Sequence, residues 1–88
     1  MADPGYAITF ARSARRELEN LDPALVNRIF PCIESLARNP RPHGCKKLSG
    51  GQNLWRIRVG NYRVLYPIED SAKAIDIVAV RHRREAYR

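Results

Sequence analysis

The chain has 88 residues, of which 44% are hydrophobic and 28% are charged, and its formal net charge is +7 at pH 7. This length supports one small domain with one modest core, which we expect residues 1–88 to form. The composition excludes a disordered chain, and no apolar run is long enough to cross a bilayer, so we expect a cytoplasmic protein without a membrane partner.

The positive charge is concentrated in two parts of the sequence. No carboxylate lies between Glu34 and Glu69, and the last eight residues contain four arginines and one glutamate. Such an excess favours nucleic acid, an acidic protein or an anionic surface as partner. Cys32 and Cys45 form neither a CxxC pair nor a zinc-type spacing with histidine. We therefore expect two free thiols, with a disulfide as the alternative, and neither a metal site nor a cofactor.

The first half of the sequence predicts one strand followed by two helices. Residues 6–10 alternate as a short strand does, and residues 11–20 carry apolar side chains at helical spacing. Asp22 is a suitable N-cap and Pro23 suits the first helical position, so a second helix is predicted from there to about residue 38. Its predicted buried stripe comprises Leu25, Ile29, Cys32, Ile33 and Leu36.

The second half predicts a loop and a three-stranded meander. Residues 41–53 contain one proline, Pro42, and three glycines, which predicts a loop. Residues 55–59 and 62–68 alternate on either side of Gly60-Asn61, a pair suited to a two-residue hairpin turn. Residues 73–80 form the predicted third strand, which is apolar on both faces and therefore expected to be central and buried on both sides.

The hairpin predicts one apolar face and one basic face. Its apolar face would comprise Trp55, Ile57, Val59, Tyr62, Val64 and Tyr66. Arg56, Arg58 and Arg63 would share the other face, with Arg58 directly opposite Arg63. Like charges in that position destabilise a sheet, so either an anionic partner covers this face or it is a solvated basic surface. We expect it to stay open.

The predicted order is β-α-α-β-β-β. Two consecutive helices followed by a mainly antiparallel sheet predict an α+β fold of two layers. The two N-terminal helices would pack on the apolar face of the hairpin.

At this point the chain resembles the toxins of the RelE/ParE superfamily, which belong to toxin–antitoxin modules. The resemblance spans nearly the whole chain and rests on residues 36–40, 47–50, 55–66 and 82–87. It implies a RelE-like fold. RelE-type toxins are known as endoribonucleases that cut mRNA in the ribosomal A site, whereas ParE-type toxins poison DNA gyrase. The basic and aromatic residues retained here favour the RelE branch.

The resemblance also implies a site. It assigns catalytic positions to Arg56, Arg58, Arg63, Arg84 and Tyr87. Further RNA-binding positions are Lys46, Lys47, Arg81 and Arg83. In RelE toxins the first two catalytic positions are lysines, but here both are arginines, which bind phosphate well and exchange protons poorly. His82, Lys46 and Lys47 are therefore the candidates for the acid–base role, and no metal ligand is expected.

The implied function is a metal-independent, ribosome-dependent mRNA interferase that inhibits translation. Its partners would be mRNA, the ribosome and a cognate antitoxin, a short acidic protein with a DNA-binding part that also brings the toxin to operator DNA. Two alternatives stay open. The first is a gyrase inhibitor of the ParE type, and the second is a catalytically weak toxin that acts as an antitoxin-bound co-repressor.

Overall fold

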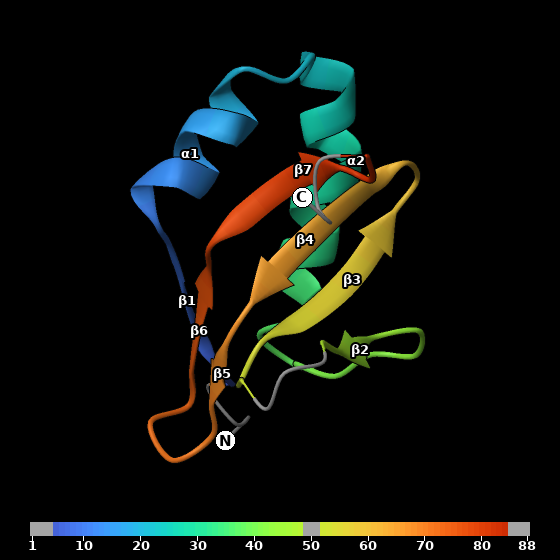
Figure 1. Cartoon of the computed structure of the whole chain (residues 1–88). Helices are drawn as coiled ribbons and strands as arrows, with labels where there is room; N and C mark the ends of the chain where they lie inside the picture. The colour runs from blue at the N-terminus through green and yellow to red at the C-terminus, as the bar shows by residue number, and fades with distance from the viewer. Residues whose placement is uncertain (1–4, 49–51, 85–88) are drawn as a thin grey trace.

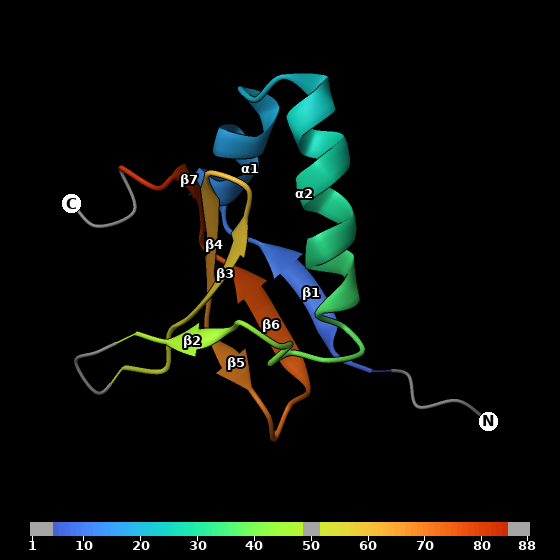
Figure 2. The same cartoon turned by 90° about the vertical axis from the view of Figure 1, so that its right-hand side faces the viewer.

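The computed structural model describes residues 5–48 and 52–84. Two helices lie on one side of two small sheets, so the predicted α+β arrangement with N-terminal helices is confirmed (Figure 1, Figure 2). No helix in this part of the chain is long and apolar enough to cross a membrane. The elements are β1 (Ala7–Phe10), α1 (Arg12–Glu19), α2 (Pro23–Ser35), β2 (Lys46–Lys47), β3 (Trp55–Val59), β4 (Tyr62–Tyr66), β5 (Ile68–Glu69), β6 (Ala74–Ile77) and β7 (Ala79–His82).

The strands form two sheets rather than the single meander that the sequence predicts. One sheet is antiparallel with the order β2-β3-β4-β7, and the other has the order β1-β6-β5, in which β1 and β6 run parallel. The predicted strand over residues 73–80 is therefore wrong as one element, because it divides at Val78 into β6 and β7. The long hairpin strand divides at Pro67, which has no N–H to donate to a ladder.

A change of register accompanies this division. Leu65 pairs with Ala79, and Ile68 pairs with Ile75. Two residues lie between the pairs on one strand and three on the other, so the second strand carries one extra residue, as in a β-bulge. A shift by one residue exchanges the two faces of a strand. This is why Ile75 before the bulge and Val80 after it both join the core.

The hairpin itself is as predicted. Arg58 pairs with Arg63 and Val59 pairs with Tyr62, which leaves Gly60 and its neighbour as a two-residue turn. Gly60 has a φ of 60°, a conformation that a residue with a side chain rarely adopts. Type II′ turns require a positive φ at this first turn position, so the glycine fixes the register of the whole hairpin.

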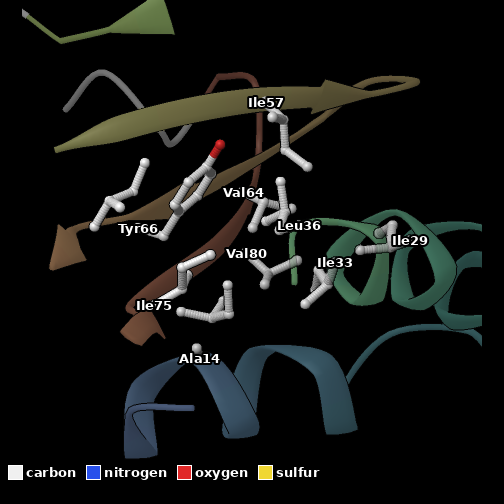
Figure 3. Packing of buried hydrophobic residues seen from close by; sticks show 11 residues of the cluster. Ala14, Ile29, Ile33, Leu36, Ile57, Val64, Tyr66, Ile75 and Val80 are labelled. Atoms are coloured by element: carbon white, nitrogen blue, oxygen red, sulfur yellow. The ribbon is translucent and has the colours of Figure 1, made fainter. Parts of the chain in front are cut away.

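The core lies between the helices and the two sheets (Figure 3). Helix α2 contributes Ile29 and Ile33 from its predicted stripe, its C-cap residue Leu36 follows, and each is 0–1% exposed. Burying one side chain of this size contributes about 1.5–3 kcal/mol, so α2 is held to the sheet mainly by these three residues. Ala14 is the buried contact of α1.

Two of the outer edges, β7 of one sheet and β1 of the other, differ in what covers them. At the β7 edge, Glu17 of α1 accepts the backbone N–H of Val80 at 2.9 Å and the Nε–H of Arg81 at 2.8 Å. Helix α1 lies beside β7 in Figure 1, and its Glu17 carboxylate therefore covers this edge. Strand β1 is the other edge, with β6 as its only strand neighbour within the described part of the chain. Exposed edges are the usual places where another strand adds.

The loop before β2 is anchored at the base of the hairpin. The Tyr66 hydroxyl, completely buried, donates to the Pro40 carbonyl at 2.9 Å, and burial raises the pKa of this phenol above its ordinary value. Arg41 binds both oxygens of Asp70 at 2.9 and 3.2 Å, which lowers the pKa of that carboxyl. The same guanidinium lies 4.6 Å from the centre of the Trp55 ring. These contacts set the position of the loop beside β3.

Candidate nucleic-acid interface

Five basic residues share the face of the antiparallel sheet that points away from the helices. Arg58, Arg63 and Arg81 are direct partners across β3, β4 and β7, so three arginines form one row. Lys46 and Arg56 are partners in the adjacent row, across β2 and β3. Direct partners in antiparallel strands have Cα atoms about 4.5–5.5 Å apart, so all these positions lie close together. We call these five residues the basic face.

The basic face is less open than the sequence predicts. Arg58 is exposed, but Arg56 is 3% exposed and Arg63 is 7% exposed. The Nε and Nη1 atoms of Arg56 are buried and have no hydrogen-bond partner in the structure as described. Buried donors without a partner cost about 1–3 kcal/mol each, and more when charged. Arg56 is therefore in a position to gain free energy from any anion that reaches it.

Arg81, at one end of the row of three arginines, forms an ion pair with a carboxylate. Glu17 neutralises Arg81 from α1, through the contact that also covers the β7 edge. Arg58 and Arg63 face each other within the hairpin, an arrangement that opposes folding and favours binding of a negative charge. A phosphate with its several oxygens could bind more than one of these planar guanidinium groups at once.

Two of the predicted site residues lie on the opposite face. His82 pairs with Tyr62, and their rings make an edge-to-face contact with centroids 5.5 Å apart. Tyr62 packs against the core, so His82 points to the helix side and not to the basic face. Lys47 is the partner of Trp55, and its Nζ lies 5.9 Å from the centre of that ring. The fold does not bring either residue together with the arginines.

The remaining predicted residues belong to the C-terminal segment. Arg83 is exposed, and its N–H donates to the carbonyl of Asn61 at the hairpin turn at 2.8 Å. Arg84 is also exposed, and its N–H donates to Nδ1 of His82 at 3.4 Å. Tyr87 lies outside the described residues.

A cavity of about 460 Å³ opens beside the basic face. It is bounded by the end of α2, by the loop before β2 and by β3. Lys46, Arg56 and Arg58 line it, and so does His43, which the sequence did not single out. No motif could have found His43, because its place depends on how the loop packs. Within residues 5–48 and 52–84, no three or more His, Cys, Asp or Glu side chains gather as a metal site would require.

Comparison with known proteins decides the family. The model of a family described as "ParE toxin of type II toxin-antitoxin system, parDE" matches residues 8–87. The chain belongs to this family. The toxin also has curated relatives across nearly its whole length. It is 31% identical over 84 residues to "Toxin RelG" of Mycobacterium tuberculosis, an alignment that covers 94% of this chain and 97% of the relative. It is 30% identical over 86 residues to "Putative toxin RelE1" of Methanocaldococcus jannaschii, covering 94% and 96%.

Solved structures agree with this assignment. The toxin superposes with a TM-score of 0.79 on a chain of the RelE–RelB complex of Pyrococcus horikoshii, at 27% identity and with 92% and 98% of the two chains covered. It superposes equally well on a chain of the RelBE2 toxin–antitoxin complex of M. tuberculosis, at 30% identity and with 89% and 98% covered. The predicted membership of the RelE/ParE superfamily and the RelE-like fold are thereby confirmed.

Proposed function

We propose that this toxin is an mRNA interferase that cuts mRNA on the ribosome and so stops translation. The observation that carries the proposal is the row Arg58, Arg63 and Arg81 beside the buried Arg56, whose Nε and Nη1 have no hydrogen-bond partner among the described residues. The likeness to proteins named RelG and RelE supports an RNA target. A surface built from guanidinium groups suits a phosphodiester.

The reaction requires no co-reactant. The ribose 2′-oxygen attacks the adjacent phosphorus, and the bond from phosphorus to the 5′-oxygen breaks. The proton of the 2′-hydroxyl is lost and the 5′-oxygen gains one, which gives a 2′,3′-cyclic phosphate and a 5′-hydroxyl end. Negative charge accumulates on the phosphorane oxygens, and Arg56, Arg58 and Arg63 would stabilise it. Electrostatic stabilisation of this kind is usually the largest catalytic contribution.

The site has fewer groups suited to proton transfer than to binding phosphate. Arginine stays protonated in proteins, so the guanidinium groups serve poorly as bases. Among the three candidates for that role, Lys46 lies on the basic face, whereas His82 and Lys47 lie on the other. Arg84 and Tyr87 complete the proposed site on the strength of the family resemblance. The ribosome would align the 2′-hydroxyl with the phosphorus, and such positioning is worth up to about 7–11 kcal/mol.

The test is cleavage of a defined mRNA by the purified toxin. We expect cleavage on ribosomes with the mRNA codon in the A site and none of the same RNA free in solution. Magnesium is needed for the ribosome itself, so metal independence is tested by replacing a non-bridging oxygen of the scissile phosphate with sulfur. Rescue of that substrate by Mn²⁺ would contradict the metal-independent mechanism.

The ParE description of the family model favours gyrase as the second candidate target. A gyrase inhibitor predicts intact ribosome-bound mRNA and cleaved DNA trapped on gyrase in the presence of ATP. The same preparation therefore distinguishes the two. If neither substrate is cut, the third alternative remains, in which the toxin only acts with its antitoxin as a co-repressor on operator DNA.

We also propose that an acidic antitoxin binds along the free edge of β1. Three neighbouring hollows lie along this edge, and Phe10 lines all three of them. Phe30 lines two of the hollows, and Arg15 and Glu19 each line two. Phe30 stacks on Phe10 and, at 39% exposure, is the one large apolar side chain classed as exposed in the described residues. The arginines of α1 border the groove, so its partner would combine apolar with acidic residues and add a strand to β1.

The titles of the P. horikoshii and M. tuberculosis structures name an antitoxin as partner of those toxins, which supports this partner class. In co-expression with a cognate acidic antitoxin that co-purifies with the wild-type toxin, Phe30→Glu should abolish co-purification. Asn27→Glu introduces the same charge at an exposed site on α2 and serves as the control. If both variants retain the antitoxin equally, the groove is excluded as its binding site. If the wild-type toxin instead forms a homodimer that Phe30→Glu disrupts, the occupant of the groove is a second copy of the toxin.

A further inference from the structure

The cavity beside the basic face lies against an uncovered edge. Strand β2 pairs only with Trp55 and Arg56, so the rest of β3 up to the hairpin turn has no strand on that side in the described structure (Figure 1). Ser35 and Cys32 of α2 form one wall of the cavity, and His43 of the loop forms another. Its volume of about 460 Å³ falls within the range of about 300–1,000 Å³ typical of small-ligand sites.

The backbone of Arg58 points into this cavity. The carbonyl of Leu54 accepts a hydrogen bond from Leu48 N–H at 2.8 Å, on the side where β2 lies. Alternate residues of a strand direct their N–H and C=O groups to the same side, so those of Arg56 and Arg58 point that way too. Beyond β2, no strand of the described residues pairs with Arg58 on this side. One backbone donor and one acceptor therefore face the cavity next to each other.

The cavity also adjoins cationic groups for which the described part of the chain shows no ion pair. Arg56 and Lys46 line it and belong to the basic face. Two buried donors of Arg56 have no hydrogen-bond partner within residues 5–48 and 52–84, and this residue is 3% exposed. Ile57 and Cys32 supply apolar contact area on the walls. The site thus combines an anion-binding end, apolar walls and an adjacent donor and acceptor.

We propose that this cavity binds one nucleobase of the RNA, with the adjoining phosphate on Arg56 and Lys46. The base edge would pair with the N–H and C=O of Arg58, because nucleobases present neighbouring donors and acceptors on their Watson–Crick edges. His43 would lie against the base plane, as aromatic side chains do in single-strand recognition. The proposal rests on RNA as the substrate and adds a subsite that selects the base beside the scissile phosphate.

A peptide strand is the competing occupant, and the observations favour it less. Only Ile57–Val59 separates β2 from the turn, so an added strand would gain the backbone groups of a single residue, Arg58. A peptide strand also offers no phosphate to the unpartnered donors of Arg56. A nucleotide satisfies both the backbone pair and the guanidinium.

The experiment is an NMR titration of the ¹⁵N-labelled toxin with each of the four 5′-mononucleotides, and in parallel with inorganic phosphate. Nucleotides should shift the backbone amide of Arg58 and those of Ser35 and His43, with one base binding most tightly. Phosphate should leave the Arg58 amide unchanged. Lys46→Gln should weaken nucleotide binding about tenfold, as expected for loss of one charge-assisted contact. Lys47→Gln removes the same charge from the opposite face and should change the dissociation constant of the nucleotide less than about twofold.

The possible results separate this proposal from the proposed function. Cleavage of ribosome-bound mRNA by the same preparation, with no nucleotide-dependent shift at Arg58, overturns the base subsite alone. Equal weakening by Lys46→Gln and Lys47→Gln overturns it too, because attraction would then be unspecific. Protection of the Arg58 amide from hydrogen exchange by an acidic protein, with no response to nucleotides, assigns the edge to a peptide. Base-selective shifts at Arg58 with intact mRNA uphold the subsite and contradict the interferase.

Discussion

Replacing Arg56 by methionine should make the toxin more stable and inactive. The side chain is 3% exposed, and its Nε and Nη1 have no hydrogen-bond partner in the described structure. Methionine keeps an unbranched apolar stem in the same place but carries no donor. Function and stability would therefore be in conflict at this residue, as is common in binding sites.

The magnitude follows from the two unpartnered donors. Each buried donor without a partner costs about 1–3 kcal/mol, and methionine removes both together with the charge. Methionine is shorter, and the void it leaves offsets part of the gain at about 24 cal/mol per Å³. We expect the free energy of unfolding to rise by about 1–3 kcal/mol, a net gain of the size set by one such donor. For a domain of this size that raises Tm by roughly 4–8 °C per kcal/mol.

The assay is urea and thermal denaturation in phosphate-free buffer, followed by circular dichroism. Arg58→Met is the matched control, because Arg58 is the next exposed side chain on the same face of β3 and its loss changes the net charge equally. It should alter stability by less than about 0.5 kcal/mol. Added phosphate should raise the Tm of the wild type and of Arg58→Met more than that of Arg56→Met. A loss of stability above about 1 kcal/mol in Arg56→Met would refute the reasoning, since it would mean that the guanidinium is held by favourable contacts.

Three other predictions concern the site and its support. Arg63→Ala should reduce mRNA cleavage on ribosomes by about 10²–10³, the usual effect of removing one transition-state donor, and cleavage near the wild-type rate would remove Arg63 from the site. Tyr66→Phe leaves the Pro40 carbonyl without its donor and should cost about 1–3 kcal/mol in urea denaturation; an unchanged midpoint would mean that water replaces the hydroxyl. The pKa of Tyr66 is raised in the folded state, so the contribution of this phenol to the free energy of unfolding is present below the unfolded pKa near 10 and is lost at higher pH. The stability of Tyr66→Phe should therefore be less sensitive to alkali than that of the wild type. The pKa of Asp70 is lowered, chiefly by Arg41, so the contribution of this carboxylate to the free energy of unfolding is present above the unfolded pKa of about 4 and is lost as the pH falls. Asp70→Asn should therefore make stability depend less on pH in the acid range. A pH dependence equal to that of the wild type would contradict this.

Part of the site could be predicted from the sequence, because it depends on local alternation. Arg58 opposite Arg63 follows from the two-residue turn at Gly60, and the structure has this register. The buried state of Arg56 and Arg63 could not be predicted this way. Alternation tells which face a side chain occupies, whereas its exposure depends on what else packs there. His43 belongs to the cavity only because the loop is anchored where Tyr66, Arg41 and Asp70 hold it.

The sequence by itself determined the two helices, the hairpin and the family, since helical and strand periodicities are local and the motifs span the chain. The tertiary structure decided which way the last strand faces. β1 and β6 pair residues 67 positions apart, and the extra residue near Val78 exchanges the faces of the strand that follows. Without that residue Arg81 would point to the core and His82 to the arginines. A bulge is specified by the partner strand and not by the alternation of the bulged one, so only the folded sheet could assign these two side chains.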